Sequence, residues 1–96
     1  MGDCIFCKII QGEIPCKKIY EDQEFLAFHD INPAAPIHFL IIPKKHIVSL
    51  ADVTDEDTAM LGRLMALIPK LAKENGCTDG FRTIINTGKN GGQAVA

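Results

Sequence analysis

The sequence predicts an α+β fold in one domain, residues 1–96, with an antiparallel sheet, a short N-terminal helix and one long helix. Apolar residues follow a helical spacing near the N-terminus and again over residues 60–72. Between these stretches lie short runs rich in β-branched and aromatic residues, bounded by turn or proline signals. The resulting order of helix, three strands, long helix and strand is typical of α+β domains.

The first helix is expected in CIFCKIIQGE, where Gly12 is a natural C-terminal stop. Pro15 then favours an extended link. The runs KKIYED and EFLAFHD predict two strands joined by an acidic turn at residues 21–23, and therefore a hairpin. A third strand is expected in IHFLIIP, which Pro43 ends.

The long helix is predicted to begin at Thr54 and Asp57, which are spaced as in a capping box. Gly76 suits the position just after its C-terminal end, and Pro69 predicts a kink or an early break. The Met and Leu stripe of this helix is expected to pack in the core. The run FRTIINTG, residues 81–88, predicts a final strand before a Gly-rich turn, and a strand after the turn would complete the sheet. The domain is therefore expected to be incomplete at its C-terminal end.

Composition excludes several classes of function. The chain is 47% hydrophobic and 23% charged, with a net charge of −2, so no electrostatic footprint for nucleic acid stands out. Neither a signal-peptide pattern nor an apolar run of membrane-spanning length occurs, which predicts a cytoplasmic protein with no membrane partner. Four cysteines are then expected to be reduced thiols or metal ligands: Cys4, Cys7, Cys16 and Cys77.

The pair Cys4 and Cys7 is the sharpest local signal. Thiolates at positions i and i+3 face one side of a helix or turn and can bind one metal ion, for which zinc is the natural choice. His46 in PKKH is the best third ligand. Two unconnected buried cysteines are the plain alternative, and a redox CxxC is disfavoured because no strand precedes it.

Three further groups could carry chemistry. Asp30 follows a strand, where its carboxylate could accept hydrogen bonds from ribose hydroxyls or merely cap a turn. His38 opens the third strand and could support a site at the sheet edge, whereas His29 is expected to be structural. The run NTGKNGGQ is not a Walker A loop, yet its amides and glycines suit a phosphate, although such runs are usually hairpin turns.

Three blocks of the chain together closely resemble the histidine triad family, in its branch of small nucleotide-binding phosphoramidases. They are CIFCKIIQGEIP, YEDQEFLAFHDINPAAPIHFLIIPKKHI and GFRTIINTGKNGGQAV, in the family's order and spacing. The resemblance implies a HIT-like antiparallel sheet that binds a purine nucleoside monophosphate or its conjugates, in a homodimer.

The resemblance also implies roles for individual residues. Asp30 would hold the ribose hydroxyls, and His38 would support the catalytic triad. Zinc would be bound by Cys4, Cys7 and His46 together with a histidine of the triad segment. The base would lie among Ile5, Phe6, Ile9, Ile14, Phe28 and Ile31, and the phosphate would be lined by Asn86, Gly92, Gln93 and Val95.

In this family a histidine of a His-x-His-x-His segment attacks the α-phosphorus, expels an amine or a second phosphate, and forms a nucleotidyl-histidine that water hydrolyses. Gln93 and backbone amides would stabilise the charge on phosphorus. That segment is expected directly after Ala96, so the 96 residues alone are expected to be inactive. Ala94 stands where some relatives carry a serine that could assist the leaving group. The absence of this serine would weaken protonation of the departing amine. The alternative is a non-catalytic nucleotide- or zinc-binding regulatory module.

Overall fold

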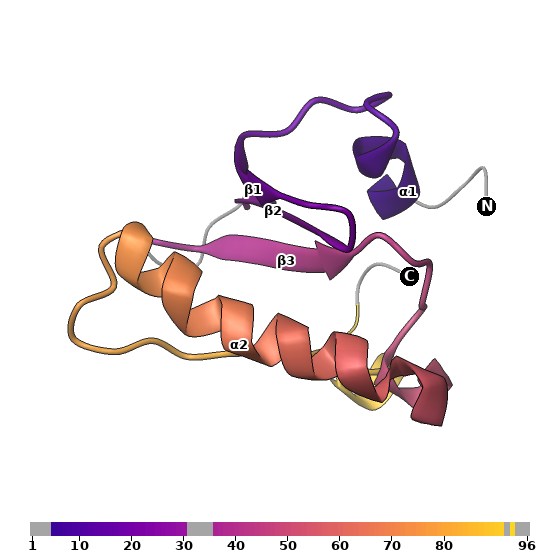
Figure 1. The fold of residues 1–96 in the computed structure, drawn as a ribbon. Helices are drawn as coiled ribbons and strands as arrows, with labels where there is room; N and C mark the ends of the chain where they lie inside the picture. Colours follow the sequence, from indigo (N-terminus) through magenta and orange to yellow (C-terminus); the bar gives the residue numbers. More distant parts are fainter. Residues whose placement is uncertain (1–4, 31–35, 92, 94–96) are drawn as a thin grey trace.

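A three-stranded antiparallel sheet lies between two helices in the computed structural model, which describes residues 5–30, 36–91 and 93 (Figure 1). In chain order the elements are α1 (Ile5–Ile10), β1 (Lys18–Glu21), β2 (Phe25–His29), β3 (Phe39–Pro43) and α2 (Thr58–Glu74). Short 3-10 turns occupy Leu50–Asp52, Asp55–Asp57 and Lys89–Gly91. The expected α+β class and the expected helix and strands up to residue 74 are confirmed.

The hairpin of β1 and β2 is closed by Asp22. Its carboxylate accepts hydrogen bonds from the backbone amides of Glu24 and Phe25, at 2.7 and 2.8 Å, and from the Tyr20 hydroxyl at 2.6 Å. A short acidic side chain that satisfies the amides of its own turn is the usual reason for Asp in such a connection. Asp22 therefore stabilises the turn that joins β1 to β2.

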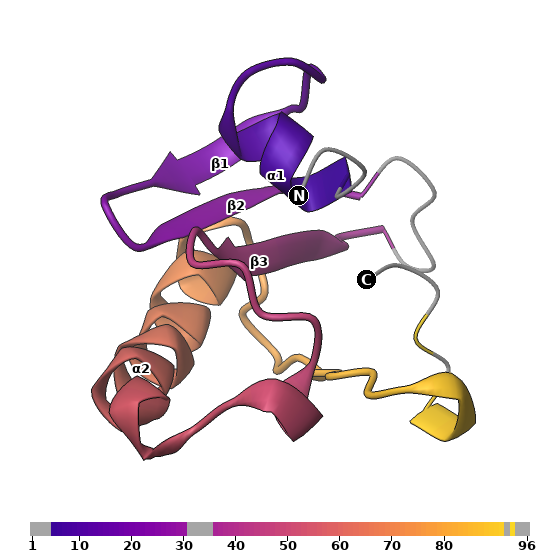
Figure 2. The same cartoon turned by 90° about the vertical axis from the view of Figure 1, so that its right-hand side faces the viewer.

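The two faces of the sheet bury different sets of residues, because side chains alternate along each strand. Phe25 and Ala27 pack against Leu67 and Leu71 of α2, which we call the α2-side core. On the opposite face Leu26, Phe28 and Ile42 form the α1-side core, against which α1 packs. Figure 2 shows the sheet between the two helices.

Both ends of α2 follow local chemistry. Asp57 accepts a hydrogen bond from the Thr54 amide at 3.0 Å, as the capping box predicts. At the other end the Cys77 amide donates to the Ala72 carbonyl and the Gly76 amide to that of Lys73, the two bonds of a Schellman motif. Gly76 has a φ of 91°, a conformation that glycine adopts without steric cost.

Two expectations are corrected. The early break at Pro69 does not occur, because α2 continues to Glu74. Pro69 has no amide hydrogen to donate to the carbonyl four residues earlier, that of Met65, and Met65 is a residue with 54% of its surface exposed. The expected strand at residues 81–88 does not form in the described chain, because a strand requires a hydrogen-bonded neighbour and β3 pairs only with β2 there. Ile84 and Ile85 are consequently more than half exposed.

None of the helices among the described residues has the length and apolar character needed to cross a membrane.

Candidate functional site

Asp30 and His38 meet at one end of the sheet. Asp30 follows β2 and His38 precedes β3, and the antiparallel register that pairs His29 with Phe39 brings the next residues together. The Asp30 amide donates to the His38 carbonyl at 3.1 Å, and His38 Nε2 lies 3.4 Å from Asp30 Oδ2. Both side chains are partly exposed, so the carboxylate and imidazole are accessible to a ligand.

The α1-side core lies on the same face of the sheet. Phe28 pairs with Leu40 in the β2–β3 register, and period-two alternation places the side chains two residues away on the same side. The rings of Phe6 and Phe28 are 6.4 Å apart between centroids and tilted by 48°, a favourable aromatic geometry. The Asp30–His38 pair therefore lies at the edge of an apolar region that includes aromatic rings.

The residues expected around a base separate into three groups. Phe6, Ile9 and Phe28 share the α1-side core and contact one cluster. Ile5 is exposed on α1 and Ile14 is half-buried after it. Ile31 lies outside the described residues. The structure thus brings together half of the expected set, on the face that α1 covers.

Cys7 and His46 are brought together across 39 positions of sequence. Cys7 Sγ on α1 lies 3.2 Å from His46 Nδ1 in the segment after β3. Tetrahedral zinc with ordinary bond lengths separates a sulfur and a nitrogen ligand by about 3.5 Å, so the two atoms fit one zinc ion after a small adjustment. Cys4 lies outside the described residues, and within the described ranges no three acidic, Cys or His side chains form a metal-binding group.

The Gly-rich turn closes on itself through Gln93. The Gln93 Oε1 atom accepts from the Gly88 amide at 2.7 Å, the Gln93 amide donates to the Gly88 carbonyl, and Gly88 has a φ of 66°. Gln93 Nε2 donates to the Val48 carbonyl at 2.7 Å. Asn86 is exposed, whereas Gly92 and Val95 lie outside the described residues. The turn is therefore attached to the same segment that carries His46.

Ion pairs next to this segment were not predicted from the sequence. Lys44 Nζ lies 2.8 Å from Glu21, and Lys45 Nζ lies 2.6 Å from Asp57. Hydrogen bonding by Lys18, and then by Lys44, lowers the pKa of Glu21 to about 2, and the Lys45 hydrogen bond lowers the pKa of Asp57. The local signal for Asp57 was its capping spacing, which says nothing about a partner twelve residues earlier.

A concave region lies at the end of β2 opposite to Asp30. This depression of about 280 Å³ is between the β1–β2 turn and α2. Its charged groups already have partners, since Arg63 makes a bidentate contact to Glu24 and Asp22 accepts hydrogen bonds from the backbone amides of Glu24 and Phe25. We therefore take the Asp30–His38 end as the candidate site, because its side chains match a nucleotide in chemistry.

Comparisons with known proteins agree over nearly the whole chain. A family model described as "Scavenger mRNA decapping enzyme C-term binding" matches residues 3–96. Protein HitA of Neisseria gonorrhoeae is 56% identical over 95 residues, which are 99% of this chain and 89% of HitA.

Solved structures show the same likeness. A HIT family hydrolase from Legionella pneumophila is 48% identical, with a TM-score of 0.93 over 97% of this chain and 84% of that chain. A zinc-bound histidine triad family protein from Mycobacterium smegmatis is 40% identical, with a TM-score of 0.82 over 98% of this chain and 68% of its own. The HIT-like fold is thereby confirmed.

Proposed function

Since the chain belongs to the histidine triad family of hydrolases, we propose that it binds a purine nucleoside monophosphate, or the nucleotidyl half of a phosphoramidate, at the Asp30–His38 end of the sheet. The observation that carries this proposal is the 3.4 Å contact between Asp30 and His38 on the same face as the Phe6–Phe28 ring pair. A carboxylate is an acceptor-only group, which suits vicinal ribose hydroxyls, and an aromatic face suits a base.

The chemistry proposed is transfer of the nucleotidyl group to a histidine. A triad histidine nitrogen forms a bond to the α-phosphorus while the bond to the leaving amine breaks; water then releases the monophosphate and frees the histidine. His38 supports this histidine, and Gln93 with the backbone amides of the Gly-rich turn faces the phosphate. An amide nitrogen carries two hydrogens, so the Gln93 bond to Val48 is compatible with that role.

The three histidines of the sequence are His29, His38 and His46, and none belongs to a His-x-His-x-His segment. We therefore propose that these 96 residues bind AMP without turnover. The test is calorimetry with AMP, followed by incubation of the exact chain with an adenosine phosphoramidate. Absence of AMP binding, or turnover at rates typical of enzymes, would each contradict the proposal.

A non-catalytic regulatory module is the second candidate, because the contacts proposed for AMP binding include no triad histidine. It shares the expected AMP binding, so the gene sequence separates the two. Codons after position 96 that read His-x-His-x-His favour the hydrolase, whereas a natural stop codon there favours the module.

We propose zinc as a structural metal held by Cys4, Cys7 and His46. Support comes from the 3.2 Å approach of Cys7 to His46 and from the zinc-bound relative. Zinc bound by Cys7 and His46 would link α1 to the segment after β3. Metal analysis of Cys7→Ser should show a loss of zinc that the matched variant Cys77→Ser does not show. Unchanged zinc in Cys7→Ser rejects the assignment.

We also propose a cytoplasmic homodimer. Phe81, Ile84 and Ile85 expose more than half of their surfaces on a segment without a strand partner among the described residues, and a second subunit would cover them. Sedimentation equilibrium of the chain tests the dimer, and a monomer at all concentrations would contradict it. Cell fractionation tests the location.

A further inference from the structure

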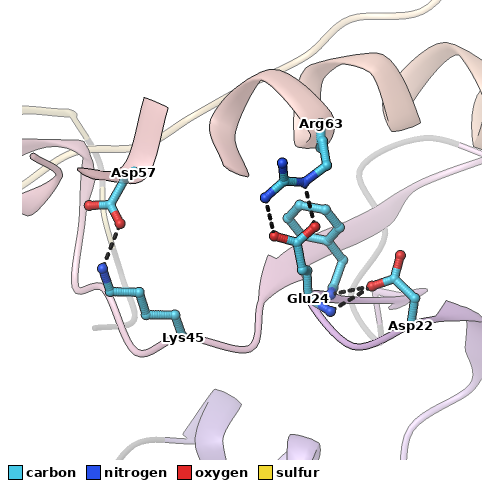
Figure 3. A network of polar contacts seen from close by, with 6 residues as sticks. Asp22, Glu24, Lys45, Asp57 and Arg63 are labelled. Atoms are coloured by element: carbon cyan, nitrogen blue, oxygen red, sulfur yellow. Dashed lines mark hydrogen bonds and ion pairs between the residues drawn. The ribbon is translucent and has the colours of Figure 1, made fainter. Parts of the chain in front are cut away.

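Asp57 is the buried charged residue of the described chain, with only 3% of its surface exposed. One carboxylate oxygen accepts from the Thr54 amide at 3.0 Å and so caps the 3-10 turn Asp55–Asp57, which leads directly into α2. The other accepts from Lys45 Nζ at 2.6 Å (Figure 3). A carboxylate in this position is held by its own helix, so it offers a fixed point to which a distant segment can attach.

Lys45 attaches that fixed point to residues 44–48, which we call the 44–48 segment. On one side of Lys45 this segment continues from β3, and on the other side it carries His46 beside Cys7. Two residues further on, the Val48 carbonyl accepts from Gln93. Lys45 is therefore adjacent to His46, the proposed zinc ligand, and close to the contact with the Gly-rich turn.

We propose that Lys45 and Asp57 are a positioning pair, which fixes the 44–48 segment against the start of α2 so that His46 Nδ1 faces Cys7 Sγ. This inference rests on the proposed zinc site. A metal-binding side chain that is ordered before the metal binds loses less conformational entropy on binding, so less of the binding free energy is offset. Asp57 also compensates the positive charge of Lys45, which would otherwise stand one residue from a bound cation.

Arg63 and Glu24 supply the matched control. This pair also joins α2 to the sheet, with two contacts of 2.5 Å, but it does so at the β1–β2 turn (Figure 3). Lys45→Met and Arg63→Met each remove one cation and keep an apolar stem. Asp57 is left unchanged because its replacement would also alter the helix cap.

The experiment measures the zinc affinity of the full chain by competition with a chelator, using zinc chloride. Loss of a partner that directly orients a metal ligand lowers metal affinity by roughly 10–100-fold. The Lys45 side chain binds Asp57 rather than His46 itself, so Lys45→Met should lower the zinc affinity by a smaller factor, about 3–10-fold. Lys45→Arg, which keeps the charge, should restore most of the affinity. Arg63→Met should leave it within about twofold of the wild type.

Hydrogen exchange of the metal-free chain is the second readout. Amides of the 44–48 segment should exchange faster in Lys45→Met than in the wild type or in Arg63→Met. If the wild type binds no zinc, the metal proposal fails and exchange alone decides the positioning role. The proposal is overturned if Lys45→Met changes neither the exchange rates nor the zinc affinity. It is also overturned if Lys45→Arg loses as much zinc affinity as Lys45→Met, or if Lys45→Met loses protection throughout α2.

Discussion

Phe25 and Phe28 provide a direct test of the two-faced sheet. Both belong to β2 and are buried, at 2% and 5% exposure, but Phe25 lies in the α2-side core and Phe28 in the α1-side core. The proposed nucleotide site is on the Phe28 face. Equal changes at the two positions should therefore cost similar stability and have different effects on AMP binding.

The stability cost follows from burial. Removal of a buried phenylalanine side chain to alanine costs about 3–5 kcal/mol. Unfolding entropy near the transition is about 2.1 cal/mol/K per residue, or about 0.2 kcal/mol/K for 96 residues. Phe25→Ala and Phe28→Ala should each lower the melting temperature by about 15–25 °C in calorimetry, if they fold. A domain of this size has only about 5–14 kcal/mol in total, so milder variants are needed for binding.

Phe25→Leu and Phe28→Leu should cost about 1–2 kcal/mol each and remain folded. Phe28 is buried against Phe6, so its replacement acts on a bound base through the Phe6 ring. Stacking on such a ring is worth about 1–3 kcal/mol, and leucine retains part of the packing beneath it. Phe28→Leu should then lower the affinity for AMP by about fivefold in calorimetry at low temperature, whereas Phe25→Leu should leave it unchanged. Equal weakening in both, or none in Phe28→Leu, would refute the assignment of the site to the α1 face.

Asp30→Asn should weaken AMP by about tenfold or more, since hydrogen bonds to a charged acceptor are worth about 1.5–3 kcal/mol. The loss of affinity caused by Asp30→Asn should be smaller for 2′-deoxy-AMP than for AMP. Equal losses for the two ligands in calorimetry would show that Asp30 does not bind the ribose hydroxyls. Gly76→Ala, at a φ of 91°, should cost about 1–2 kcal/mol in urea unfolding, whereas Gly62→Ala inside α2 should gain up to about 1 kcal/mol. Similar effects at the two glycines would contradict the assigned cap. Lysine hydrogen bonds, above all that of Lys18, lower the pKa of Glu21 from 4.5 to about 2, so its stabilisation is present above about pH 5 and is lost as pH falls towards 2. Glu21→Gln should be less stable than the wild type at pH 7 and equal to it near pH 2; a difference that does not depend on pH would exclude this ion pair as its cause.

Much of the fold follows from short-range signals. Two strand-like runs on either side of an acidic turn located the hairpin, and the spacing of Thr54 and Asp57 located the turn from which α2 continues. Gly76 located its end because a left-handed residue closes a helix most readily when it is glycine. The early break at Pro69 was wrong: the proline lies inside α2, one turn after the exposed residue Met65, and which side of a helix faces water is decided by tertiary packing.

The candidate site was only partly predictable. The CxxC spacing and PKKH suggested Cys7 and His46 as ligands, and Asp30 and His38 stood out at strand ends. Their chemistry could be read from residue type and position. The depression beside α2 and the attachment of Gln93 to Val48 had no local signal at all.

The sequence by itself determined the elements, their order and the chemical types available, because propensities, caps and turns act over a few residues. Only the tertiary structure decided that Cys7 meets His46, that Asp57 is buried beneath Lys45, and that residues 81–88 form no strand in the described chain. Those outcomes depend on sheet register and on which faces pack. Both are set by the summed burial of residues far apart in the chain, which local patterns do not contain.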